Sequence, residues 1–74
     1  MYVTTIQKEY YPNRIHLFKV RLEGSFEDQL KFSVEVWEEN ATTGSSRLLE
    51  TVYLKMYEEV IKFANKYYQY HVTN

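Results

Sequence analysis

Residues 46–70 have the sequence SRLLETVYLKMYEEVIKFANKYYQY, and the fold that we predict depends on this stretch. Apolar side chains recur in it at steps of three and four residues, which is the spacing of one face of an α-helix. Charged and amide side chains occupy the opposite face. The spacing therefore predicts one amphipathic helix over residues 46–70, with Ser45 or Ser46 as its N-cap. The apolar row consists of Leu49, Tyr53, Met56, Val60, Phe63 and Tyr67.

A second apolar row lies beside the first on the predicted helix and widens the apolar arc to roughly 200°. Its members are Leu54, Tyr57, Ile61, Ala64 and Tyr68. This arc is wider than one face of a small sheet needs. We therefore expect part of the second row to contact another molecule, most simply the helix of a second copy. Packing at the sheet margin of a monomer is the alternative. The candidate interaction residues on the helix are Leu54, Tyr57, Ile61 and Tyr68.

Three upstream segments have the character of β-strands, and two of them alternate apolar and polar residues with period two. The segments are residues 2–10, 15–22 and 30–38, of which the first alternates least regularly. In the hairpin between the second and third segments we expect Phe18 opposite Val34. This register puts the apolar side chains on one face, whereas a shift of one residue would expose half of them.

The connection between the first two segments contains Pro12 and Asn13, which favour a turn. The apolar pattern predicts a three-residue turn over residues 12–14, with Tyr10 opposite His16. A two-residue turn is the alternative, but it would place a glutamine inside the core.

These elements predict a single α+β domain over residues 1–74. The architecture is β-β-β-α, a three-stranded antiparallel meander with one long C-terminal helix packed across one face. A chain of this size buries only about 60% of the surface that its unfolded form exposes. Large aromatic side chains, namely eight Tyr, four Phe and one Trp, are therefore expected to supply much of the core.

The composition argues against several classes of protein. The chain has no cysteine, so neither disulfides nor cysteine-based zinc sites can stabilise it. Its formal net charge of −1 is not typical of a protein that binds a phosphate backbone. No stretch approaches the roughly 20 apolar residues of a membrane span, and no signal pattern is present at the amino end. We expect a cytoplasmic protein that does not contact a membrane.

Catalytic chemistry is not indicated by the side chains available. His16 and His71 are far apart in sequence, and neither has a serine and an acid placed to form a triad. Glu58 and Glu59 are adjacent on the predicted helix and diverge by about 100°, which does not suit one metal ion. The two glycines form no phosphate-binding loop. The sequence therefore predicts a non-enzymatic protein without cofactor or metal.

A contact patch is expected on the sheet face that the helix leaves open. Ile15, Leu17 and Trp37 should lie there, with Ile15 opposite Trp37 in the predicted hairpin. A tryptophan with aliphatic neighbours on an uncovered face is typical of a protein-binding surface. The alternative is that Trp37 is covered by the loop at 38–46 or by the C-terminal tail.

These observations predict a small protein-interaction module, homodimeric, that binds a larger protein of unknown identity. A small, cysteine-free and tyrosine-rich chain would suit a phage or mobile-element protein that modulates a host protein, although no motif supports that association. The alternative function is binding of single-stranded nucleic acid on the open sheet face. The residues for it are Lys19, Arg21, Lys31 and Trp37, and the near-zero net charge counts against it.

Overall fold

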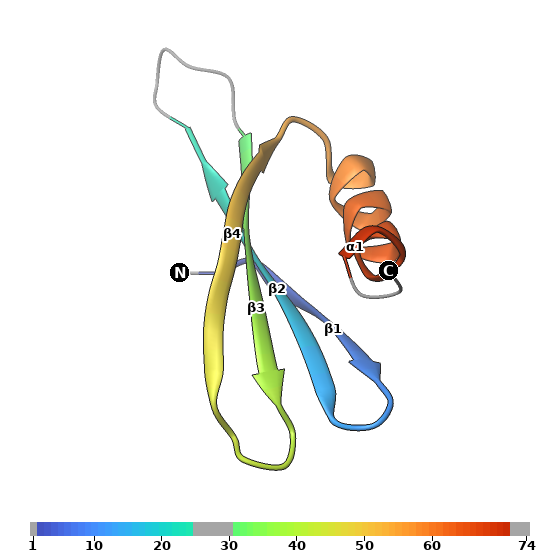
Figure 1. Cartoon of the computed structure of the whole chain (residues 1–74). Helices are drawn as coiled ribbons and strands as arrows, with labels where there is room; N and C mark the ends of the chain where they lie inside the picture. The colour runs from blue at the N-terminus through green and yellow to red at the C-terminus, as the bar shows by residue number, and fades with distance from the viewer. Residues whose placement is uncertain (1, 25–30, 72–74) are drawn as a thin grey trace.

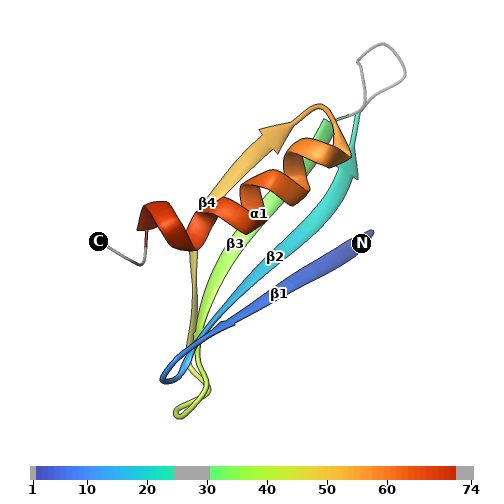
Figure 2. The same cartoon turned by 90° about the vertical axis from the view of Figure 1, so that its right-hand side faces the viewer.

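The computed structural model describes residues 2–24 and 31–71, and their side chains as far as Tyr67. The described chain forms a four-stranded antiparallel sheet followed by one helix (Figure 1). The strands follow one another in the sheet in chain order, and the helix lies across one face (Figure 2). The α+β class is thus confirmed, and the predicted number of three strands is wrong. The elements are β1 (Thr4–Tyr10), β2 (Arg14–Glu23), β3 (Lys31–Asn40), β4 (Ser46–Leu54) and α1 (Tyr57–His71).

The predicted helix over residues 46–70 is wrong in its first part, because Ser46–Leu54 is the edge strand β4. Thr51, Val52 and Tyr53 are β-branched or aromatic, and such side chains favour a strand. Pairing with β3 also supplies hydrogen-bond partners along an edge that would otherwise be unpaired. The helical spacing of Leu49 and Tyr53 in the sequence is therefore coincidental.

A β-bulge in β4 explains why its alternation is hard to recognise in the sequence. Val36 of β3 pairs with Glu50, but the next residue, Trp37, pairs with Leu48. Leu49 is the extra residue, and it packs against the core. A bulge inserts one residue and changes the face on which the following side chains lie, so no single period-two pattern runs through this strand.

Helix α1 begins where a carboxylate can accept a hydrogen bond from the backbone before the first turn. The Met56 backbone N–H donates to Glu59 Oε1 at 3.1 Å. Glu58 and Glu59 also lie in the first helical turn, where acidic side chains interact favourably with the helix dipole. These two glutamates therefore stabilise the N-terminus of the helix. The sequence analysis had placed that N-terminus at Ser45 or Ser46 instead.

The core lies between α1 and the sheet face that it covers. Helix α1 contributes residues spaced by four and three, and the central strands contribute alternate residues. The aromatic rings meet edge to face, with the Phe18 centroid 6.0 Å from that of Phe63 and 5.6 Å from that of Tyr67. The buried apolar residues are Phe18, Val20, Val34, Val36, Val60, Ala64 and Tyr67.

Both predicted hairpin registers differ from the structure by two residues. Phe18 pairs with Val36 and not with Val34, and it also pairs with Ile6 of β1. The first turn comprises residues 11–13 and contains a cis Tyr11–Pro12 bond. Side chains alternate with period two, so a two-residue shift keeps each side chain on its predicted face. The predicted pairing that involves Leu30 lies outside the described residues.

In the described part of the chain, no helix is both long and apolar enough to cross a membrane.

Loss of buried volume should destabilise this small core. Val20→Ala should lower the free energy of unfolding by about 2–3 kcal/mol, because the side chain is fully buried. Val3→Ala is the matched control, since 57% of Val3 is exposed, and it should change stability by less than about 0.5 kcal/mol. Urea unfolding of the two variants measures both effects. Equal destabilisation by the two substitutions would contradict the assigned core.

Candidate functional site

The open face of the sheet, opposite α1, carries an apolar row that crosses three strands. Leu17 of β2 pairs directly with Trp37 of β3, and Trp37 pairs directly with Leu48 of β4. Paired residues lie side by side on the same face of a sheet. These three residues are called the Leu17–Trp37–Leu48 row below. They lie on the open face because their neighbours along β2 and β3, including Phe18 and Val36, point into the core.

The row is accessible to a partner. Leu48 is 48% exposed, and Leu17 and Trp37 are half-buried. Ile15, also half-buried, lies two residues from Leu17 on the same face of β2. The structure thus brings together the sheet residues predicted for the contact patch. It corrects one detail, because Ile15 pairs with Glu39 and Leu17 takes the place opposite Trp37. Sequence analysis missed Leu48 because its segment was assigned to the helix.

A polar cluster borders the row on one side and is centred on the carboxylate of Glu35. Tyr2 donates its hydroxyl hydrogen to Glu35 Oε1 at 2.8 Å, and Trp37 Nε1 donates to the same oxygen at 3.0 Å. Arg21 Nη2 lies 3.7 Å from Glu35 Oε2. The hydrogen bond from Trp37, followed by that from Tyr2, lowers the pKa of Glu35 below its ordinary value. The indole is therefore held in place by a carboxylate that stays ionised.

Two cations of this cluster lie over aromatic rings. Lys19 Nζ is 4.8 Å from the centroid of the Trp37 ring, and Arg21 Cζ is 4.6 Å from that of Tyr2. The contacts of the indole come from the sheet itself, since Lys19 belongs to β2 and Glu35 to β3. The residues predicted for nucleic-acid binding share this face by strand position, but Lys31 is six residues from Trp37 along β3. Lys31 is exposed at the start of β3 and pairs with Glu23.

The other side of the row is acidic. Ile15 of β2 pairs with Glu9 of β1 on one side and with Glu39 of β3 on the other. Gln7 Nε2 donates to Glu9 Oε1 at 3.1 Å. The open face therefore carries charges on both sides of the apolar row, with Lys19, Arg21 and Glu35 on one side and Glu9 and Glu39 on the other.

A second polar cluster lies on the α1 side of the sheet and contains His16. The imidazole is only 1% exposed, so His16 is a core residue. Its Nε2 lies 3.3 Å from Glu38 Oε2, while its buried Nδ1 has no hydrogen-bond partner among the described residues. The ring meets Tyr10 and Tyr67 edge to face, with centroids 5.2 Å and 5.5 Å away. His16 thus lies among aromatic rings, with the Glu38 carboxylate beside it.

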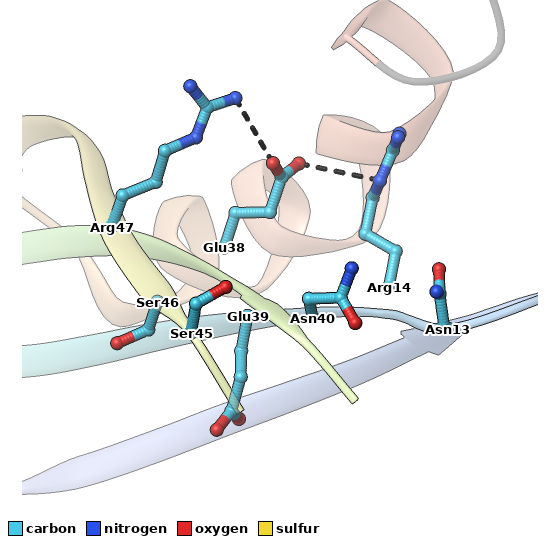
Figure 3. A pocket seen from close by; sticks show the side chains of 8 residues that line it. All are labelled: Asn13, Arg14, Glu38, Glu39, Asn40, Ser45, Ser46 and Arg47. Carbon is cyan, nitrogen blue, oxygen red and sulfur yellow. Dashed lines mark hydrogen bonds and ion pairs between the residues drawn. The ribbon is translucent and has the colours of Figure 1, made fainter. Parts of the chain in front are cut away.

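Two arginines converge on Glu38 from either side (Figure 3). Arg14 Nε lies 3.5 Å from Glu38 Oε2, and Arg47 Nη2 lies 3.2 Å from Oε1. Burial alone would raise the pKa of Glu38, but the hydrogen bonds from His16 and Arg47 and the charge of Arg14 lower it overall. These contacts connect the ends of β2, β3 and β4. A cavity of about 400 Å³ adjoins them and is lined by Asn13, Arg14, Glu38, Glu39, Asn40, Ser45, Ser46 and Arg47.

Helix α1 is fixed to β4 by a hydrogen bond from Tyr67. Its hydroxyl donates to Glu50 Oε2 at 2.6 Å. Burial, followed by this hydrogen bond, raises the pKa of Tyr67 well above its ordinary value. The neutral phenol is therefore the form that the folded protein favours.

The candidate interaction residues on the helix are dispersed by the structure. Leu54 belongs to β4 and packs against the core, which contradicts its predicted place at the helix margin. Tyr57 is 44% exposed and lies against Phe32, with ring centroids 5.7 Å apart. Ile61 is 37% exposed. The side chain of Tyr68 lies outside the described part. Two exposed apolar side chains thus remain from the predicted helical surface.

The described residues contain no group of three or more side chains able to ligate a metal ion. Comparison with protein families, with curated proteins and with solved structures gave no match for this chain. The Leu17–Trp37–Leu48 row is therefore the candidate functional site, because it combines exposed apolar surface with a rigidly held tryptophan.

The contacts of Glu38 should make the free energy of unfolding depend on pH in the acidic range. A carboxyl whose pKa is lowered on folding stabilises the protein at pH values above its ordinary pKa of 4.5. This contribution is lost as the pH falls through the lowered pKa. Glu38→Gln should therefore reduce the difference in unfolding free energy between pH 7 and pH 3. Urea unfolding at both pH values measures that difference. Glu39→Gln removes the adjacent carboxylate on the other face, and equal changes in the two variants would contradict a specific role for this cluster.

Proposed function

We propose that this chain is a non-enzymatic protein-interaction module that binds through the open face of its sheet, and that its partner there is a second copy of the chain. The observation that carries the proposal is the direct pairing of Leu17, Trp37 and Leu48 across three strands. An apolar centre with a polar rim is the ordinary anatomy of a protein interface. Tryptophan is also among the residues that most often dominate binding energy.

The way in which Trp37 is held supports its role as an anchor. Its indole donates to Glu35 and lies beneath the ammonium group of Lys19. An anchor that is already fixed loses less conformational entropy on binding than a mobile side chain does. The face therefore needs little rearrangement to accept a partner.

A second copy suits this face because the face carries both signs of charge. The formal net charge of the chain is −1, so long-range repulsion between copies is small. The cations and the carboxylates of this face can each meet the opposite sign on another copy. A small domain also gains stability when an apolar face is covered by a symmetry mate.

Binding of single-stranded nucleic acid is the second candidate, since Lys19, Arg21 and Trp37 lie on one open face. It is supported less well. Both cations lie over aromatic rings, and the ionised Glu35 lies between them. A fixed carboxylate at this position would repel a phosphate backbone. Another protein surface is therefore a better partner for the apolar row than a nucleic acid is.

Substitution of the row should abolish self-association without unfolding the chain. Leu48→Glu places a charge on an exposed position of the edge strand β4, so the monomer should fold. It should weaken dimerisation at least about tenfold, because a charge would be buried in place of a leucine. Sedimentation velocity from about 1 µM to about 1 mM covers binding in the ordinary range of weak dimers.

Ile61→Glu is the matched control for the alternative interface. It places the same charge on the exposed face of α1 and should leave the dimer unchanged. A wild-type protein that stays monomeric over the whole range would contradict the proposed function. Loss of the dimer in Ile61→Glu but not in Leu48→Glu would place the interface on the helix instead.

A further inference from the structure

We infer that the two copies pack open face to open face about a two-fold axis that runs along the strands, midway between β2 and β3, so that Lys19 of each copy faces Glu35 of the other. This inference rests on the proposed self-association and adds its geometry. It follows from the register of β2 and β3, in which side chains of opposite sign lie directly opposite each other on the open face.

The topology of the sheet singles out this axis. In a dimer of two stacked sheets, the two-fold axis lies in the plane between them, and both copies use the same surface. The midline of this four-stranded sheet runs between β2 and β3. A rotation about that line places β2 of one copy over β3 of the other, and β1 over β4. Every strand is then covered, whereas an axis along β3 would leave β1 without a facing strand.

The charges of the two central strands match under this rotation. Each residue of β2 faces, in the second copy, the β3 residue with which it pairs in its own sheet. Lys19 pairs with Glu35, and Glu23 pairs with Lys31. Both pairs therefore bring opposite charges together between the copies, which favours association.

The apolar residues match in the same way. Leu17 pairs with Trp37 in one sheet, so each of them faces the other type in the second copy. Two leucines and two indoles then meet at the axis. The arrangement is an aligned sandwich, with the sheets about 10 Å apart and crossing at about 30°. The helices lie on the two outer surfaces, so Tyr57 and Ile61 remain exposed.

The Glu35 carboxylate can accept the facing ammonium group. Its Oε1 accepts the hydrogen bonds from Tyr2 and Trp37. Its Oε2 lies 3.7 Å from Arg21, which is longer than a hydrogen bond, so this oxygen can accept from Lys19 of the second copy. Each ammonium group then has one carboxylate beside it in its own sheet and another across the interface.

Like charges approach each other only towards the rim of this part of the interface. Glu39 faces Ile15 of the second copy and lies diagonally across from its own counterpart. It is one residue from the end of β3, where water and salt screen charges. The opposite charges of Lys19 and Glu35, in contrast, lie beside the apolar centre.

Two other simple axes bring carboxylates together beside the centre. An axis along β3 sets Glu35 against Glu35 of the second copy. An axis across the strands, along the Leu17–Trp37–Leu48 row, sets Glu35 against Glu39, because these two residues lie two positions from Trp37 in opposite directions. Like charges brought together at an interface are destabilising. The register therefore favours the axis between β2 and β3.

Neutralisation of Glu35 distinguishes the three axes by the sign of its effect. Glu35→Gln keeps an oxygen that can accept from the indole, but it removes the charge that faces Lys19. It should raise the dissociation constant of the dimer about fivefold to tenfold, because two symmetry-related ion pairs are lost. With either of the other axes, the same substitution relieves repulsion and should lower the dissociation constant.

Glu9→Gln is the matched control, because it gives the same net charge. Glu9 faces Ser46 of the second copy in the proposed dimer, so the dissociation constant should change by less than about twofold. Sedimentation equilibrium measures the three dissociation constants, and circular dichroism establishes that each variant is folded.

A distance between spin labels tests the direction of the axis. The chain has no cysteine, so Lys31→Cys accepts one label per copy. Lys31 is six residues from Trp37 along β3. An axis along the strands keeps the two labels at the same end of the dimer, less than about 25 Å apart by pulsed electron paramagnetic resonance. An axis across the strands would separate them by about 40 Å. Labels at Glu58→Cys, on the outer helices, should be more than about 30 Å apart.

A weaker Glu35→Gln dimer together with the short distance at residue 31 supports the geometry. A tighter or unchanged Glu35→Gln dimer, or a distance of about 40 Å at residue 31, would overturn the geometry while the dimer itself stands. A monomeric wild-type protein would overturn the proposed function as well.

Discussion

The pairing of β4 with β3 is the constraint on which the rest of this structure depends. It removes residues 46–54 from the helix and makes them the fourth strand of the sheet. Val52 and Leu54 thereby join the core from the sheet side. The same pairing places Leu48 beside Trp37 on the opposite face. Both the core and the candidate interface are therefore products of one strand-to-strand register.

The two faces of the sheet are stabilised in different ways. On the α1 side, Phe18 and Tyr67 pack edge to face among fully buried valines, so burial of apolar surface is the main contribution. On the open side, Trp37 is held by a carboxylate and an ammonium group, and Leu48 beside it is exposed. The sheet therefore has one face covered by α1 and one open face (Figure 2).

The faces of the strands could be predicted from the sequence, but their registers could not. The alternation of Phe18, Val20 and Val34 determines which side chains are buried, and these residues are buried as expected. A two-residue shift leaves that alternation unchanged, so the apolar pattern cannot distinguish Val34 from Val36 as the partner of Phe18. The prediction of Ile15 as the partner of Trp37 was wrong for the same reason, since Leu17 and Ile15 are both apolar and lie on the same face.

The helix boundary was wrong for a different reason. Leu49 occupies a β-bulge, so the period-two pattern on one side of it does not continue on the other. By coincidence, Leu49, Tyr53 and Met56 continue the helical spacing of the apolar residues in α1, which begins at Tyr57. The local sequence of residues 46–54 was compatible with a helix and with a strand, and pairing with β3 selected the strand. The Glu59 side chain that accepts from the Met56 backbone was the local signal that could have marked the start.

The most direct test of the account uses Trp37, which is the only tryptophan in the chain. If the open face is buried between two copies, the indole should pass from a half-exposed to a buried environment as the protein concentration rises. Its fluorescence emission maximum should then move to shorter wavelengths between about 1 µM and about 1 mM, with acrylamide quenching falling in parallel. An emission maximum and a quenching constant that stay unchanged over this range, in protein shown to be folded, would contradict the account.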